Sequence, residues 1–112
     1  MNRVNFDRLL DAELTRVQEV LGSKGAEYAP DNNDALHNFR VAAELQDETL
    51  TQAVAGMMAK HTVSIYDMAK SYKVFSQDVW AEKITDHINY LILLKAAAKD
   101  EEDDNATGFD QS

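Results

Sequence analysis

The stretch TLTQAVAGMMAKHTVSIYDMAKSY, residues 49–72, decides the fold class. Its inner-face positions recur every three or four residues, which places them on one side of an α-helix. They form a single broad stripe: Leu50, Val54, Met57, Met58, His61, Ile65, Met68 and Tyr72. Strand-like alternation is not sustained here. The sequence therefore predicts a long amphipathic helix that begins near Thr49 or Thr51.

Three further segments have the same helical spacing. Their predicted bounds are Asn5–Leu21, Asn33 or Asp34 to Leu45, and a start at Ser76 to about Lys99. Gly22 is expected to end the first helix, and residues 24–33 are expected to form a structured loop. Four helical segments and no sustained strand pattern predict an all-α bundle in one domain, residues 1–99.

The charge is concentrated at one end of the sequence. The chain has 112 residues and a net charge of −9. Six of its 20 acidic residues lie in residues 100–112, which contain no lysine or arginine. Because this segment has no apolar periodicity, we expect a flexible, disordered acidic tail there. DNA mimicry by this tail is an alternative to simple solvation.

The composition excludes several classes of function. There is no cysteine, which excludes disulfide frameworks, thiolate zinc sites and cysteine catalysis. The acidic balance argues against a basic groove for nucleic acid. The N-terminus lacks the apolar stretch of a signal peptide, and the longest apolar run, Tyr90–Leu94, is too short to span a bilayer. We therefore expect a cytoplasmic protein that does not bind membranes.

Two polar stripes stand out against this pattern. One is on the third segment and the other on the fourth: Lys60, Ser64, Asp67 and Ser71, then Glu82, Asp86 and Asn89, with Lys83 and His87 beside the second. If the two helices pack antiparallel, the stripes meet over a cleft, where carboxylates from both helices would suit Mg²⁺. The alternative is that these charges form solvated ion pairs.

Several aromatic and histidine residues have two interpretations each. His61 lies within the apolar stripe, so it is either a hydrogen-bonded core residue or a functional imidazole. His37 is either a ligand-binding residue or a brace at the start of the second helix. Tyr28 and Trp80 are either stacking platforms for a base or members of the core.

Four blocks of sequence resemble a family of small phage and prophage proteins. They are KGAEYAP at 24–30, DALHNF at 34–39, GMMAKHTVSIYDM at 56–68 and WAEKITDHINYL at 80–91. That family is similar in helix order to the all-α nucleoside triphosphate pyrophosphohydrolases of the MazG type. The likeness covers roughly residues 20–97. It implies an all-α MazG-like fold, a nucleotide ligand, magnesium, and a homodimer or tetramer in the cytoplasm of a host cell.

The match to the enzyme motifs is partial. MazG-type enzymes carry Glu-Glu-x-x-Glu on one helix and Glu-x-x-Asp on the next. Here Asp67 keeps the last acid of the first motif and Asp86 the last acid of the second, while Lys83 stands at a glutamate position. Two of five metal ligands remain, and Glu82 is a neighbouring substitute.

The resemblance thus assigns a role to each candidate residue. Metal binding falls to Asp67 and Asp86, and catalysis to Glu82, Asp86 and His61. Ligand binding falls to a set that surrounds them: Lys60, Lys83, Tyr28, His37 and Asn89. The leading hypothesis is a nucleotide-binding protein, in its enzymatic form a Mg²⁺-dependent pyrophosphohydrolase. The alternatives are a non-catalytic acidic protein that binds a host protein, and a purely structural bundle.

Overall fold

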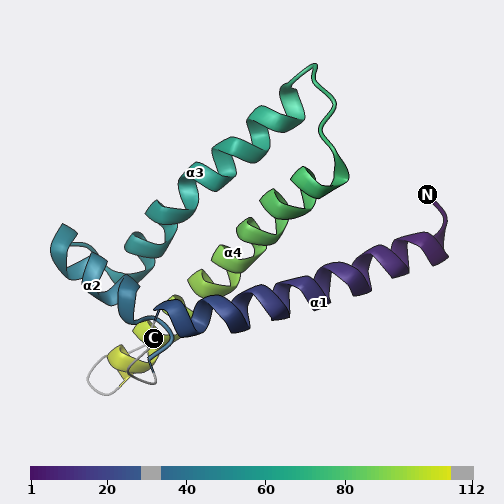
Figure 1. Ribbon diagram of the computed structural model, residues 1–112. Helices are drawn as coiled ribbons and strands as arrows, with labels where there is room; N and C mark the ends of the chain where they lie inside the picture. The colour runs from purple at the N-terminus through teal and green to yellow at the C-terminus, as the bar shows by residue number, and fades with distance from the viewer. Residues whose placement is uncertain (29–33, 107–112) are drawn as a thin grey trace.

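A computed structural model describes residues 1–28 and 34–106, with the side chains of residues 24–28 and 105–106 outside the description. It contains four helices: α1 (Arg3–Tyr28), α2 (His37–Gln46), α3 (Leu50–Lys70) and α4 (Gln77–Ala106). No strand occurs in the described ranges. The all-α prediction and the count of four helices are confirmed (Figure 1).

Local side-chain bonds fix where three helices begin. Thr49 forms a capping box, in which its hydroxyl accepts from the backbone N–H of Gln52 and the Gln52 side chain accepts from the Thr49 backbone N–H. The Ser76 hydroxyl accepts from the backbone N–H of Val79 at 3.3 Å, as the predicted cap at Ser76 requires. Asn2 caps α1 in the same way, accepting from the N–H of Asn5 at 2.8 Å.

Three predicted helix bounds are wrong. α2 begins at His37, not near Asn33 or Asp34. α1 continues through Gly22 to Tyr28, so residues 24–28 are helical rather than part of a loop. A glycine in a helix interior costs only about 1 kcal/mol, which neighbouring turns can offset. α4 continues past Lys99 to Ala106, so residues 100–106 of the predicted disordered tail are helical. Residues 29–33 of the predicted loop and 107–112 of the tail lie outside the described residues.

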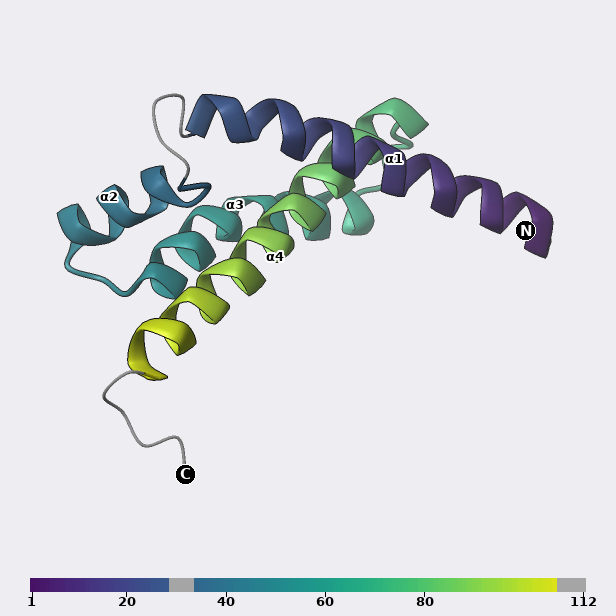
Figure 2. The same ribbon diagram turned by 90° about the horizontal axis from the view of Figure 1, so that it is seen from below.

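The long helices α3 and α4 form an antiparallel hairpin, seen in Figures 1 and 2. Contacts at three levels fix their register: Thr62 with His87, His61 with Tyr90, and Thr51 with Glu101. The short helix α2 packs near the start of α3. α1 crosses α4, and its N-terminal half stands clear of the hairpin (Figure 2).

The main core gathers at one end of the hairpin, which we call the base. Its buried members come from the turn before α2 and from α2, α3 and α4: Leu36, Phe39, Leu50, Val54, Leu93 and Ala97. Leu21 of α1 and Tyr90 of α4 pack against this cluster. The base is therefore the place where all four helices meet.

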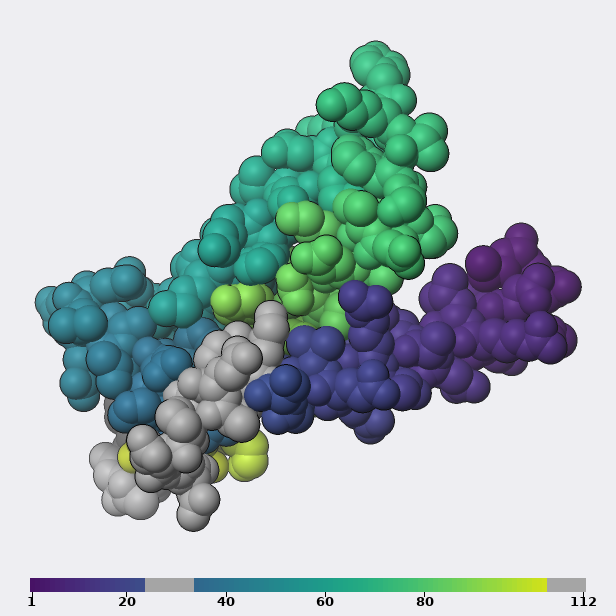
Figure 3. Space-filling view, in the orientation of Figure 1, coloured from purple at the N-terminus to yellow at the C-terminus, as the bar shows by residue number. Residues whose placement is uncertain are grey.

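The opposite end of α1 has no such cover. Residues 3–12, which we call the arm, are all exposed, whereas Val17 further along the same helix is 5% exposed. The radius of gyration is 16.9 Å, against about 13 Å for a compact domain of this length. The arm contributes to this extended shape, as Figure 3 shows.

Candidate functional site

Two polar residues of α4 are buried, one helical turn apart. Thr85 is 1% exposed and Asn89 is 4% exposed, and the buried apolar residues Leu93 and Ala97 follow at the same four-residue spacing. The Thr85 hydroxyl donates to the carboxylate of Glu13 on α1, at 2.9 and 3.2 Å to its two oxygens. This bond attaches α1 to α4 at the point where the arm begins.

Asn89 differs from Thr85 in its hydrogen bonding. Among the described residues, neither its Nδ2 nor its Oδ1 has a hydrogen-bond partner. A buried polar group left without a partner costs about 1–3 kcal/mol, so a carboxamide with both ends unpaired is unfavourable for folding alone. Such a group calls for an explanation, and a bound molecule that donates and accepts is one.

Tyr90, the residue after Asn89 on α4, belongs to a cluster of aromatic rings. The ring of Tyr90 lies 4.8 Å from that of His61 on α3, with 33° between the planes. Tyr90 also meets Phe39 of the base edge-on, with the centroids 6.4 Å apart. His61 therefore packs against an aromatic ring of the facing helix and is half-buried, and both interpretations of its role stay predictions.

The second histidine of this interface is His87. Its Nε2 lies 2.7 Å from the hydroxyl of Thr62 on α3, and either atom can be the donor according to the tautomer. Both His61 and His87 thus contact a residue of the facing helix, and Asp86, next to His87, is half-buried.

The other predicted site residues differ in how exposed their side chains are. Lys60, Asp67 and Glu82 are exposed, and Lys83 and His37 are half-buried. The side chain of Tyr28 lies outside the described residues. Of the predicted set, Asn89 is buried, while His61 and Asp86 are half-buried like Lys83 and His37.

The metal prediction finds no complete ligand set here. Within the described residues, no group of three or more His, Asp or Glu side chains is placed to hold a metal ion. Mg²⁺ prefers near-octahedral oxygen coordination and usually takes one or two carboxylates plus phosphates and waters. Asp67 and Asp86 therefore do not form a self-sufficient protein site, and a magnesium role depends on a ligand that brings its own oxygens.

A hollow lies between α1 and α4. Its volume is about 430 Å³, and its apolar lining comes from both helices: Leu9, Ala12, Trp80, Ala81 and Ile84. Arg16 and Asp78 also line it. Trp80 is half-buried, and its ring also meets Phe75 edge-on at 6.4 Å. Its predicted stacking role remains a prediction.

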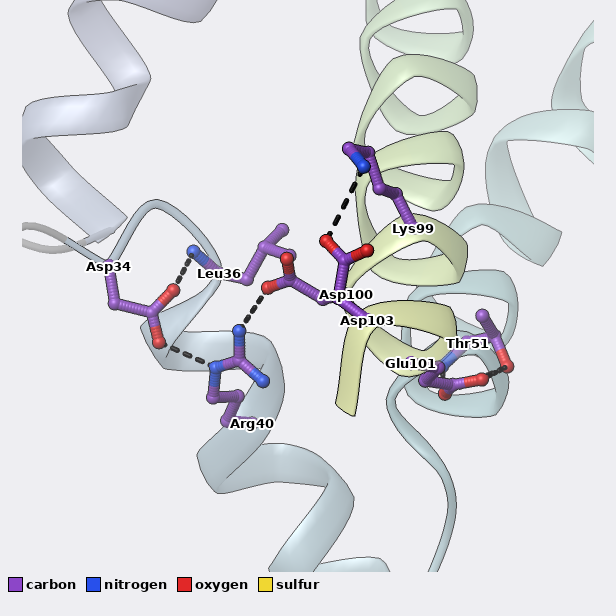
Figure 4. Close-up of polar contacts among 8 residues, drawn as sticks. All are labelled: Asp34, Leu36, Arg40, Thr51, Lys99, Asp100, Glu101 and Asp103. Atoms are coloured by element: carbon purple, nitrogen blue, oxygen red, sulfur yellow. Dashed lines mark hydrogen bonds and ion pairs between the residues drawn. The ribbon is translucent and has the colours of Figure 1, made fainter. Parts of the chain in front are cut away.

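Polar contacts that the sequence did not indicate hold the base together (Figure 4). Arg40 of α2 bonds both Asp34, at 2.6 Å, and Asp100 of α4. Its hydrogen bond to the Asp34 carboxylate, opposed by partial burial, holds the pKa of Asp34 below the ordinary value of 3.8. Glu101 accepts from the backbone N–H of Thr51 at 2.7 Å and from its hydroxyl. These partners are 50 and 60 residues apart, so no local spacing signals them.

Comparison with family models, with curated proteins and with solved structures gave no match. The resemblance to phage proteins and to MazG-type enzymes therefore stays a prediction. Among residues 1–28 and 34–106, no helix has the length and apolar content that crossing a bilayer requires.

Proposed function

We propose that this chain binds a nucleotide, or a related phosphate-bearing ligand, along the polar stripe of α4 formed by Glu82, Asp86 and Asn89. The three residues share one helix face at intervals of four and three positions, and the face spans about 10 Å of the helix axis. It passes from exposed Glu82 through half-buried Asp86 to buried Asn89. A ligand on this face would thus reach from solvent to the interior.

The unpaired carboxamide of Asn89 is the observation that carries the proposal. It offers one acceptor and two donor hydrogens that no described residue pairs with. An asparagine side chain of this kind pairs well with a ring edge that presents a donor next to an acceptor, as adenine does. A nucleobase would therefore relieve the cost that Asn89 imposes on the fold.

The phosphate end of the ligand would lie toward the exposed end of the stripe. Half-buried Lys83 is adjacent to Glu82, and exposed Lys60 is on the neighbouring helix α3. Lysine ammonium groups bind phosphate as point charges. In a chain of net charge −9, local cations of this kind are needed to offset the repulsion of a polyanion.

Hydrolysis is a separate matter from binding. The resemblance implies magnesium-dependent pyrophosphate release, but the described residues gather no group of three metal ligands. We therefore assign no catalytic step to Glu82, Asp86 or His61. A requirement for Mg²⁺ is an outcome that the binding experiment can reveal.

Titration calorimetry with nucleoside mono-, di- and triphosphates, with and without Mg²⁺, tests the proposal. We expect saturable binding by the wild type and at least about a tenfold weaker affinity for Asn89→Leu, since a buried hydrogen-bonding pair is lost. Gln46→Leu is the matched control, because Gln46 is an exposed carboxamide at the end of α2. No binding by the wild type, or equal binding by Asn89→Leu, would refute the proposal and favour the non-catalytic interaction protein.

A further inference from the structure

The carboxamide of Asn89 is closed off from solvent in this structure. Asn89 is 4% exposed and lies in the middle of a buried face of α4, with Thr85 one turn before it and Leu93 one turn after it. A molecule that pairs with the Asn89 side chain therefore needs some part of the fold to move first. The element that covers this face controls entry.

Helix α1 lies across this face of α4 (Figure 1). Its Glu13 accepts from the hydroxyl of Thr85 at 2.9 Å, and its Leu21, about two turns later, packs against the base core. Val17 lies midway between these two residues on the same side of α1. Because the contacts advance together along both helices, Val17 comes opposite Asn89, and Val17 is itself 5% exposed. The covered half of α1 is therefore the cover of Asn89 on this side.

The attachment of α1 to the rest of the protein is less extensive than that of α3. Among the described residues the main packing partner of α1 is α4, whereas α3 packs against both α2 and α4. Residues 3–12 are all exposed, so only the second half of α1 holds the helix in place. Segments with few buried contacts open at a lower free-energy cost than the core of a fold. The movement that uncovers Asn89 most readily is therefore that of α1.

We propose that α1 is a lid, which detaches from α4 while the hairpin of α3 and α4 stays folded and thereby uncovers Asn89. Detachment breaks the bond between Glu13 and Thr85 and exposes Val17 and Leu21 to water, and these losses keep the lid closed. Opening also lets water reach the unpaired carboxamide of Asn89, which offsets part of the cost. Admission of a nucleotide to the opened face rests on the proposed function, whereas the movement of α1 does not.

Amide hydrogen exchange of the whole chain, followed by mass spectrometry without any ligand, tests the movement. A detached α1 should fray, because most helical stability in proteins comes from packing rather than from propensity. We therefore expect residues 13–23 of α1 to be at least about tenfold less protected from exchange than residues 53–63 of α3. Equal protection of the two segments would show that α1 opens only when the whole protein unfolds, and would overturn the lid.

A matched pair of threonine substitutions locates the opening at α1. Thr85→Val removes the bond to Glu13 and should speed the exchange of residues 13–23 at least about threefold. Thr62→Val is the control, because it removes a threonine hydroxyl that bonds His87 between α3 and α4, and it should leave that exchange unchanged. Equal acceleration by both substitutions, or none by Thr85→Val, would overturn the lid. If Thr85→Val does not fold, the comparison of the two wild-type segments decides.

A covalent link between α1 and α4 tests the lid as the route of entry. Glu13→Cys combined with Thr85→Cys places two thiols in a chain without cysteine, at side chains that touch in the closed state. Joined by a short bis-maleimide, this variant should bind adenosine triphosphate at least about tenfold more weakly than the same variant capped with N-ethylmaleimide. Equal affinity of the two forms would overturn the lid as a gate and leave the proposed function standing. Absence of binding by the wild type would refute the proposed function, while hydrogen exchange would still decide whether α1 opens.

Discussion

The base and the arm are built from the same kind of amphipathic helix, yet one is covered and the other is not. At the base, Phe39 is 2% exposed and Val54 is fully buried, and Arg40 and Glu101 fasten the helix ends. At the arm, Leu10 keeps 41% of its surface exposed, and residues 3–12 are all exposed. Helical periodicity shows that a face will be buried. It does not show whether the same chain buries it.

The largest expected effect compares an aromatic residue from each end of the hairpin. Phe39→Ala should lower the free energy of unfolding by about 3–5 kcal/mol, because it removes a buried ring from the base core. Tyr72→Ala, at the far end, should change it by less than about 0.5 kcal/mol, since Tyr72 is fully exposed. Urea unfolding followed by circular dichroism measures both. Equal losses would mean that Tyr72 is covered in solution and that the comparison of the two ends is wrong.

The next effect compares the paired and unpaired polar residues of α4. Thr85→Val should destabilise the protein by about 1–3 kcal/mol, because Glu13 loses its partner in a partly buried position. Asn89→Leu should leave stability unchanged or raise it, by up to about 1 kcal/mol, because it removes two unsatisfied atoms. Thermal unfolding without added nucleotide measures whether each substitution lowers or raises the stability. A large loss for Asn89→Leu would indicate that its carboxamide is satisfied within the fold, contrary to the ligand proposal.

A smaller effect concerns the junction between arm and base. Gly22→Ala should raise the free energy of unfolding by about 0.5–1 kcal/mol, because Gly22 lies inside α1 and an added Cβ meets nothing within 4 Å. Gly56→Ala in α3 is the matched control, with the same open surroundings and the same expected gain. Should Gly56→Ala stabilise and Gly22→Ala destabilise, α1 would be broken at Gly22 as the sequence suggested.

The smallest effect is the pH dependence of the base. The pKa of Asp34 is lowered in the folded state, chiefly by its hydrogen bond from Arg40. The stabilisation it gives is therefore present above about pH 3.8 and is lost as the pH falls below that value. Arg40→Met should cost less than about 1 kcal/mol at neutral pH, because both side chains are about one-third exposed.

The loss in Arg40→Met should shrink toward zero as the pH approaches 2, and high salt should reduce it at neutral pH. Chemical unfolding of the wild type and of Arg40→Met across this range measures it. A difference that is independent of pH would show that Arg40 stabilises the base by packing its methylene groups instead.

The helices were predictable because the residues that form and begin each helix are close together in the sequence. The stripe of α3 follows from three- and four-residue spacing, and Ser76 has the side chain that a helix start requires. The end of α4 was not predictable, because Asp100 and Glu101 are ordered by Arg40 and Thr51, which are far away in the sequence. Net charge alone suggested a disordered segment there.

The candidate site was predictable only in part. Spacing placed Asp86 and Asn89 on one face of α4, and the structure leaves Asp86 half-buried and buries Asn89. Spacing could not tell which flank of α3 faces that helix, and Lys60 and Asp67 prove to be exposed. The groove beside Trp80 depends on the crossing of α1 over α4, a tertiary arrangement that no short motif encodes.

The bond between Glu101 and the first turn of α3 can form only late in the synthesis of the chain. The free amide of Thr51 receives its partner from a residue translated 50 positions later. While the ribosome is still adding residues 52–100, α3 has only the Thr49 cap, and the base lacks the helix that supplies Leu93 and Ala97. The nascent chain must therefore hold apolar surface in solution until about residue 101 has emerged, which makes it a candidate client for chaperones.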